Sequence, residues 1–302
     1  MRVIITGATG LIGSALVRSL LGDRHAVTRL VRAPQGSTAP GVTDVSWDPA
    51  RGLLDASALE GHDAAVHLAG EPVAEGRWTV EKKRRIRESR VKGTRLVAET
   101  LARLKQKPRV LVSASAVGIY GDRGGELLRE ESAPGKDFLS EVCREWEAAA
   151  RPAVEAGIRV VHPRLGVVLD AEGGALPKML TPFKFGVGGR IGSGRQYMSW
   201  ITLADVVGVI RRALTDENLR GPVNAVGPNP VTNEEFTKAL GRVLGRPTFL
   251  AVPEFAARLA FGEVADALLL ASQRVEPARL KEAGFQFADP ELEGALRRVL
   301  KK

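Results

Sequence analysis

The stretch MRVIITGATGLIG, residues 1–13, decides the fold, because it has the pattern of a buried strand that ends in a glycine turn and opens a helix. Gly7, Gly10 and Gly13 stand at the spacing of a dinucleotide-binding fingerprint. Gly7 permits the sharp turn, Gly10 lets the backbone approach a pyrophosphate, and Gly13 lets the helix lie close to the sheet. The anion would rest on free N–H groups at the helix N-terminus. A structural turn without ligand is the alternative interpretation.

Outward from this stretch, short β-branched runs alternate with amphipathic segments of helical length. The pattern predicts strands at residues 3–6, 25–31, 64–68, 110–113 and 160–163, and helices at residues 11–21, 81–104 and 140–156. Such alternation predicts an α/β fold with a doubly wound parallel sheet, the Rossmann type. Beyond about residue 165, glycine and proline cluster and the helical segments shorten. We therefore expect an NADP-binding Rossmann domain over residues 1–165 and a smaller C-terminal substrate-capping region over residues 166–302.

Composition excludes several classes of protein. The 302 residues carry a net charge of +9, but the basic residues are scattered and their dense run, residues 82–95, reads as a solvated helix, so we expect no nucleic-acid partner. We find no apolar run of membrane-spanning length and expect a cytoplasmic protein without membrane contact. The single cysteine, Cys143, excludes an internal disulfide and a thiolate metal site, and we predict no metal.

The second strand indicates which dinucleotide binds. An NAD-preferring fold places an acidic residue about 20 residues beyond the glycines, where it holds the ribose 2′-hydroxyl and repels a 2′-phosphate. Residues 24–43 contain no acidic side chain, whereas Arg29 and Arg32 are present. A guanidinium at the strand's end can bind a phosphate with two hydrogen bonds. We therefore predict NADP(H), with a solvated loop arginine as the alternative for Arg32.

The helix predicted from residue 81 carries an arginine in its apolar stripe. Ile86, Arg90, Gly93 and Val97 follow one another at helical spacing, and Gly93 would let the helix approach its neighbours closely. A buried arginine needs an anion, so Arg90 either points toward the cofactor cleft, or snorkels, or pairs with a local carboxylate.

Several segments resemble a known family. TGATGLIG at residues 6–13, HLAG at 67–70, SASAVGIYG at 113–121 and the pair Pro163-Arg164 look like extended short-chain dehydrogenases of the nucleotide-sugar epimerase kind. DFLSEVCREWEAAA at 137–150, GGRIGSGRQYMSWI at 188–201 and SQRVEPARLKEAGFQF at 272–287 are similar to the atypical "epimerase family" branch, which ends in a short domain of unknown function, here at about residues 250–300.

The resemblance implies roles for individual residues. It assigns Arg32 to the 2′-phosphate, Val168 to the border of the nicotinamide, Arg90 to a place where ordinary members hold asparagine, and Asp205 to anchoring the C-terminal lobe. It assigns two groups by their common ligand: the pyrophosphate to Gly7, Thr9, Gly10, Leu11, Ile12 and Gly13, and the adenosine and ribose to Leu68, Ala69 and Gly70.

The catalytic pair of ordinary members is missing. In Tyr-x-x-x-Lys the lysine lowers the tyrosine pKa, so that the phenol exchanges a proton near neutral pH. Here the residues four positions beyond the two tyrosines, Tyr120 and Tyr197, are glycine and isoleucine. Alignment on Glu147 puts Leu139 and Cys143 where tyrosine and lysine belong.

The sequence leaves open which residues replace that pair. Ser115 occupies the place of the family's catalytic serine, and Tyr120 is expected at the same mouth, although without a cation beside it the phenol would keep a pKa near 10. Ser115 could equally cap local backbone. Water, Cys143 or a residue of the glycine-rich stretch are further alternatives.

Two functions are consistent with the sequence. One is an NADP(H)-dependent oxidoreductase or epimerase-like enzyme that acts on a small polar substrate. The other is an NADP(H)-binding sensor or partner-docking protein that has lost the proton-transfer pair. A homodimer through the fourth and fifth helices is expected by analogy with other short-chain dehydrogenases.

Overall fold

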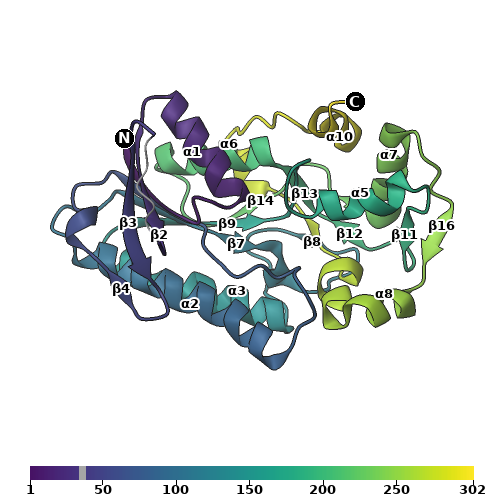
Figure 1. Ribbon diagram of the computed structural model, residues 1–302, viewed down its shortest axis with the longest axis horizontal. Helices are drawn as coiled ribbons and strands as arrows, with labels where there is room; N and C mark the ends of the chain where they lie inside the picture. The colour runs from purple at the N-terminus through teal and green to yellow at the C-terminus, as the bar shows by residue number, and fades with distance from the viewer. Residues whose placement is uncertain (34–38) are drawn as a thin grey trace.

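A large, mostly parallel sheet forms the centre of the molecule (Figure 1), in a computed structural model that describes residues 1–33 and 39–302. Its strand order is β14-β9-β6-β5-β1-β2-β3-β4, with β7 paired to β9, and among the described strands of this sheet only β3 and β4 pair antiparallel. The strands are β1 (Arg2–Thr6), β2 (Ala26–Val31), β3 (Val42–Asp48), β4 (Leu53–Leu54), β5 (Ala64–His67), β6 (Val110–Ser113), β7 (Ser115–Ala116), β9 (Arg159–Leu165) and β14 (Gly221–Ala225). The predicted doubly wound α/β fold is confirmed.

The strand order reverses between β1 and β5. From β1 the chain moves outward through β2 and β3, and from β5 it moves the other way through β6 and β9. In open α/β sheets a crevice forms at this switch point, beyond the carboxyl ends of the strands. The topology therefore puts the glycine turn after β1 and the segment after β5 at the edge of one crevice.

Helices cover both faces of this sheet. α1 (Leu11–Gly22) and α6 (Leu203–Thr215) pack on one face, and α2 (Val80–Arg103) and α4 (Arg151–Glu155) pack on the other, with α3 (Phe138–Ala148) beside α2 (Figure 1). Two apolar cores result, one around Leu16 and Val209 and the other around Val97 and Leu111. Strands buried on both faces explain the continuous apolar runs that mark them in the sequence.

The smaller lobe has a separate core. Its helices α5 (Leu176–Lys184), α7 (Asn233–Leu244) and α10 (Leu292–Leu300) pack through Leu180, Leu240 and Leu296. Further elements of the chain are η1 (Ser57–Leu59), η2 (Val117–Tyr120), β8 (Leu127–Leu128), β10 (Val167–Leu169), β11 (Gly189–Ile191), β12 (Tyr197–Met198), β13 (Trp200–Thr202), β15 (Val231–Thr232), β16 (Leu250–Val252), α8 (Glu254–Phe261), the π-helix η3 (Ala265–Leu270), β17 (Arg274–Val275) and α9 (Ala278–Glu282).

The structure differs from two sequence predictions. The helix predicted at residues 140–156 is divided into α3 and α4, because Pro152, in the first turn of α4, has no N–H to continue the hydrogen bonds of α3. The predicted boundary at residue 165 does not separate the layers, since α6 and β14 return to the central sheet after it. After α5 the chain therefore returns to the central sheet with α6 and β14, and only then forms the rest of the smaller lobe.

Asp205 ties the C-terminal segment to α6. Its buried carboxylate accepts hydrogen bonds from the backbone N–H of Ala288 at 2.7 Å and of Asp289 at 3.1 Å. This agrees with the anchoring role that the family resemblance implies. In residues 1–33 and 39–302, no helix has both the length and the hydrophobicity that a bilayer crossing requires.

Candidate dinucleotide-binding site

A cleft of about 700 Å³ opens at the carboxyl ends of β1, β2 and β5. It lies at the switch point of the sheet, where doubly wound folds bind nucleotides. Seven of the residues that the sequence assigned to a cofactor line it: Gly7, Thr9, Gly10, Arg32, Leu68, Ala69 and Gly70. The structure thus brings together segments from three separate parts of the chain.

The glycine turn fits a bound pyrophosphate, because side chains are excluded from it. Gly7 has a φ of +66°, and a Cβ there would lie 2.8 Å from the carbonyl carbon of Leu68. A Cβ at Gly13 would lie 2.1 Å from the Gly7 oxygen. No side chain of the described residues caps the N-terminus of α1, so its first N–H groups face the cleft without a side-chain acceptor. These amides and the helix dipole suit an anion.

Two arginines lie at the end of the cleft beside β2, and they differ in whether they form an ion pair. Arg29 forms a bidentate ion pair with Asp44, at 2.7 Å and 2.8 Å. Arg32 is exposed at the end of β2 and makes no ion pair within the described residues. Sequence reasoning missed Asp44, which lies one residue beyond the window searched for acids. The pairing of β2 with β3, which puts Arg29 opposite Asp44, was the signal that could have found it.

The wall after β5 is held by a threonine and a histidine. The Thr6 hydroxyl oxygen accepts hydrogen bonds from the N–H groups of Leu68 at 3.1 Å and Ala69 at 3.2 Å, and it lies 2.8 Å from Nδ1 of His67. Because the oxygen already accepts twice, its proton is directed to Nδ1, which fixes a neutral imidazole. Complete burial lowers the pKa of His67 to about 4, with a further contribution from the charge of Arg90. The pair therefore holds the cleft wall in place at neutral pH.

Arg90 lies behind this wall and does not line the cleft. Its Nη1 donates to the carbonyl oxygens of Glu71 at 2.9 Å and Ile86 at 3.2 Å, and its guanidinium lies over the ring of Trp146. It forms no ion pair with a carboxylate of the described residues, so the alternative of a local carboxylate partner has no support, and cofactor binding by Arg90 stays a prediction. A Cβ at Gly70 would come within 3.3 Å of the guanidinium carbon. Arg90 thus supports the position of residues 70–71 from the side of α2.

The other predicted cofactor residues stand at the margin. Leu11, Ile12 and Gly13 form the first turn of α1, and Ile12 packs into the core beneath it. Val168 lies in β10, and its carbonyl oxygen is near Gly174, which in turn faces the side chain of Leu11. Their proximity is consistent with one continuous path along the cleft edge. None of these side chains belongs to the 700 Å³ lining itself.

The place of the usual catalytic groups is filled by a closed polar network. Ser115 Oγ donates to Glu147 Oε1 at 2.7 Å, and Arg164 binds both oxygens of Glu147 at 2.9 Å and 3.0 Å. Arg164 Nη1 also donates to the Tyr120 hydroxyl, which donates to Asn224 Oδ1 at 2.6 Å. The Arg164 charge and the Ser115 hydroxyl hold the pKa of Glu147 below its usual range despite burial. The carboxylate is therefore charged and fully engaged.

The structure corrects the expected position of Tyr120. The ring is completely buried and lies within a small core cluster, not at the mouth of the cleft. Burial raises the pKa of its hydroxyl to about 12, although Arg164 opposes the shift. Ser115 is also buried, with 1% of its surface exposed. As they stand here, neither hydroxyl can reach a substrate.

Cys143 is equally unsuited to replace the missing lysine. Burial and the nearby Glu147 charge raise the pKa of its thiol to about 12. The thiol therefore stays protonated at neutral pH and packs as an apolar group in the same core cluster as Tyr120.

A glycine cradle at the switch point of a Rossmann sheet, with cations at its ribose end, defines the class: an NAD(P)-binding protein of the extended short-chain dehydrogenase type. The chain belongs to the NAD dependent epimerase/dehydratase family, whose model matches residues 3–227, and residues 252–299 match a domain of unknown function, DUF1731. The resemblance seen in the sequence is confirmed.

Relatives and solved structures cover nearly the whole chain. An epimerase family protein of Mycobacterium tuberculosis is 46% identical over 286 residues, 94% of this chain and 93% of that protein. The crystal structure of human epimerase family protein SDR39U1 with NADPH superimposes with a TM-score of 0.90 at 36% identity and covers 100% of both chains. That of the nucleoside-diphosphate sugar epimerase from Corynebacterium glutamicum gives a TM-score of 0.81 at 40% identity and covers 99% of this chain and 58% of that one.

Proposed function

We propose that this chain is an NADP(H)-dependent oxidoreductase or epimerase-like enzyme that acts on a small polar substrate. The observation that carries the proposal is the combination of the glycine cradle with Arg32, which is exposed at the β2 end of the same cleft and has no ion pair among the described residues. A 2′-phosphate needs a cation there, and a guanidinium binds it with two hydrogen bonds. The NADPH in the crystal structure of the human relative supports the same choice of cofactor.

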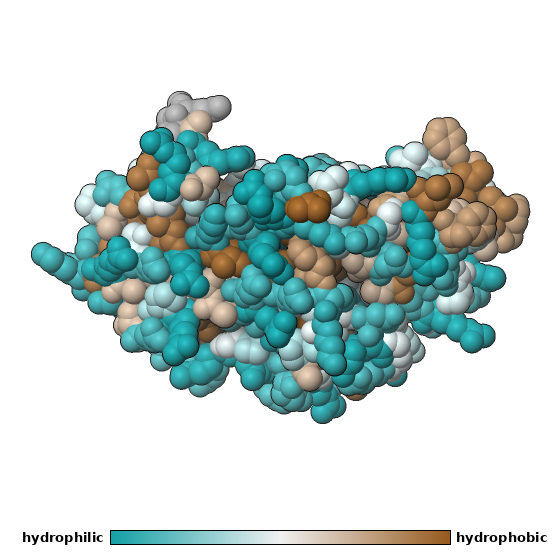
Figure 2. Space-filling view, turned by 90° about the horizontal axis from the view of Figure 1, so that it is seen from below, coloured by the Kyte–Doolittle hydropathy of each residue, from teal (hydrophilic) through white to brown (hydrophobic). Residues whose placement is uncertain are grey.

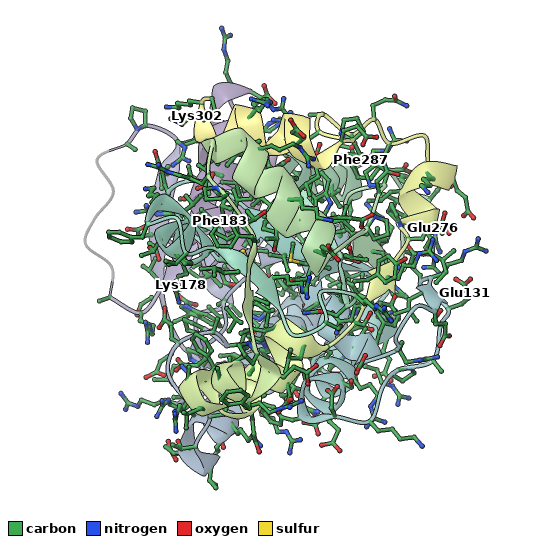
Figure 3. All side chains as sticks on the ribbon, turned by 90° about the vertical axis from the view of Figure 1, so that its right-hand side faces the viewer. Glu131, Lys178, Phe183, Glu276, Phe287 and Lys302 are labelled. Carbon is green, nitrogen blue, oxygen red and sulfur yellow. The ribbon has the colours of Figure 1, made fainter. Side chains whose placement is uncertain are left out.

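Individual residues then have defined tasks. The amides of Thr9, Leu11, Ile12 and Gly13 hold the pyrophosphate where Gly7 and Gly10 let it approach the backbone, and Leu68 to Gly70 border the adenosine and ribose. The nicotinamide supplies the hydride chemistry. The protein contributes orientation and shielding from water, for which the smaller lobe is well placed. Lys178 of α5 donates to the Ala74 carbonyl oxygen at 3.4 Å, which ties the lobe to the segment that follows the cleft wall (Figure 3 labels Lys178).

A second candidate function is a non-catalytic NADP(H)-binding sensor. The observation that favours it is the closed network of Ser115, Glu147, Arg164 and Tyr120, because the two hydroxyls and the guanidinium are hydrogen-bonded within the described residues. A sensor needs the cofactor site but no proton-transfer group. The enzyme remains our first proposal, since an enzyme can take its proton from water in the cleft.

Turnover distinguishes the two functions. The purified protein, loaded with NADPH or NADP⁺, is mixed with panels of sugars, nucleotide sugars, aldehydes and ketones, while the absorbance of reduced nicotinamide is followed. The sugars are also analysed for epimers, because epimerisation regenerates the cofactor, and either a net absorbance change or an epimer counts as turnover. Oxidation or reduction of the cofactor that depends on one substrate class, and that is lost in Gly10→Val, supports the enzyme. Stoichiometric, tight binding with no turnover across the panels supports the sensor instead.

A further inference from the structure

Eight apolar side chains stand exposed together at the end of the smaller lobe. The aromatic patch, as we name it, comes from the turn after α5, from β16 with the residue before it, and from α8. Figure 2 shows tan and brown side chains gathered at its right-hand end, over these elements. The members are Phe185, Val187, Phe249, Leu250, Val252, Phe255, Leu259 and Phe261, with exposed fractions between 37% and 81%.

Backbone pairing makes the patch continuous. β11 and β16 run parallel, with Gly189 opposite Leu250 and Ile191 opposite Val252, so the turn after α5 lies beside the start of α8. Figure 3 faces this end of the molecule, with α8 as the yellow-green helix along its lower edge. β16 pairs with β11 alone among the described strands, and all three of its residues are exposed. The patch therefore includes an unprotected strand edge, which is a template for pairing with another chain.

The exposed apolar area of the patch is close to the area that one partner buries in a protein–protein interface. A phenylalanine carries about 150–250 Å² of surface, so the four in the patch expose on the order of 500 Å², before leucine and valine are added. The largest apolar patch of a typical monomer is about 300–600 Å². A standard specific interface buries roughly 800 Å² on each partner. The patch is thus large for a free surface and close to what one side of a stable dimer requires.

The charges around the patch are compensated only in part: exposed Lys184, Arg190 and Arg246 stand beside it and make no ion pair within the described residues. Arg258 of α8 pairs with Glu254 and with Asp266, and Lys83 of α2 pairs with Glu263. Two identical copies that meet here therefore place the unpaired cations at the rim of the contact, where physiological salt screens them. An anionic membrane would also attract these cations, but the open N–H and C=O groups of β16 need another strand, which a second copy supplies and a lipid surface does not. The net charge of +9 acts over a longer range and is screened beyond about 8 Å at physiological salt.

We infer that the aromatic patch is the contact between two copies of this chain, in which the patch of one covers the patch of the other. The strand edges of β16 and its counterpart face each other across the twofold axis. This differs from the homodimer expected by analogy through the fourth and fifth helices, which are α2 and α3 here. Their shared surface carries charged side chains, with Arg87 of α2 paired to Glu141 and Glu145 of α3. The inference does not depend on the proposed function.

The molar mass of the protein in solution shows whether two copies associate through the aromatic patch. Light scattering on the size-exclusion column should give twice the 32.3 kDa of one chain for the wild type at tens of micromolar. Phe255→Glu and Phe249→Ser, which change exposed side chains, should give the monomer mass while the circular dichroism spectrum stays that of the wild type. Val154→Glu is the matched control, because Val154 is 55% exposed on α4, outside the patch, and should stay dimeric.

Two further conditions separate the alternatives. An apolar contact persists in 1 M NaCl, whereas a contact through the charged surface of α2 and α3 weakens as salt screens it. A monomeric wild type, a dimer that survives both patch substitutions, or a dimer that dissociates in high salt overturns the inference. So does a monomer that co-sediments with phosphatidylserine vesicles through Phe255, since that assigns the patch to a membrane.

Discussion

Arg29 and Asp44 are joined across neighbouring strands by two hydrogen bonds, Nε to Oδ1 at 2.7 Å and Nη2 to Oδ2 at 2.8 Å. The Asp44 side chain is 5% exposed and both residues line the cleft. Arg29 therefore compensates a carboxylate that stands close to the proposed 2′-phosphate position. Under the proposed function, Arg32 binds the phosphate itself.

Replacing Arg32 should change the choice between cofactors. We expect Arg32→Asp to weaken NADPH binding at least tenfold more than NADH binding, about 1.4 kcal/mol or more, because a repulsive carboxylate replaces the attractive cation. Calorimetric titration measures both. Arg18→Asp, an exposed position of α1 with the same charge change, serves as the control and should leave the ratio unaltered. Equal weakening of both cofactors would show that Arg32 does not bind the 2′-phosphate.

Replacing Arg29 should weaken NADPH binding because Asp44 then lacks its cation. Arg29→Ala leaves a nearly buried carboxylate without its cation, so we expect NADPH to bind roughly tenfold more weakly. NADH should be affected less, because a ribose hydroxyl can donate to the freed carboxylate. The double variant Arg29→Ala/Asp44→Ala should recover part of the NADPH affinity in the same titration. No recovery would mean that Arg29 acts by direct contact instead.

A larger side chain in the glycine turn should abolish cofactor binding. A Cβ at Gly10 would lie 3.3 Å from the Gly7 oxygen, a tight contact that needs a small shift of the turn, and a larger side chain would project over the N–H groups of α1. Gly10→Val should therefore abolish binding of both cofactors while the far-ultraviolet circular dichroism and the melting temperature change little. Retained binding in this variant would exclude the turn as the pyrophosphate site.

The buried network should be structural in either function. Glu147→Ala leaves Arg164 charged and unpaired in a buried site, which costs roughly 3–5 kcal/mol of unfolding free energy. Ser115→Ala removes one hydrogen bond to the carboxylate and should cost only about 1–2 kcal/mol. Urea denaturation gives both values. If Ser115→Ala instead leaves stability intact and abolishes turnover, the serine is a catalytic residue and the network opens during the reaction.

His67 should make the protein sensitive to acid. Its pKa is about 4 when folded against 6.5 when unfolded, so between these values the unfolded chain binds more protons and stability falls as the pH falls. The full difference amounts to about 3 kcal/mol. Burial also lowers the pKa values of His62 and His162, which act in the same direction. We expect a shallower dependence of unfolding free energy on pH in His67→Gln between pH 7 and 4.5; identical slopes would refute this origin.

The glycine turn and the main strands could be predicted because they are local signals. Gly7, Gly10 and Gly13 lie within seven residues, and each buried strand is a short apolar run. β14 was missed because Pro222 and Asn224 interrupt its pattern, and its place in the sheet depends on pairing with β9, about 60 residues away. A strand whose place depends on pairing with a strand distant in sequence could therefore not be predicted.

The site shows the same limit. Arg32 and the residues after β5 were found because each follows a predicted strand. Asp44, Glu147 and Asn224 acquire their roles only through partners distant in sequence, and Tyr120 was misplaced because its burial depends on Arg164 and Asn224. A cytoplasmic location stays a prediction.

Titration of the cofactor-free protein with NADPH and with NADH, followed by nicotinamide fluorescence or heat, tests the central claim most directly. We predict a single site per chain that binds NADPH at least tenfold more tightly than NADH. Equal affinities would contradict the assignment of Arg32, and no binding of either cofactor would contradict the site itself and both proposed functions.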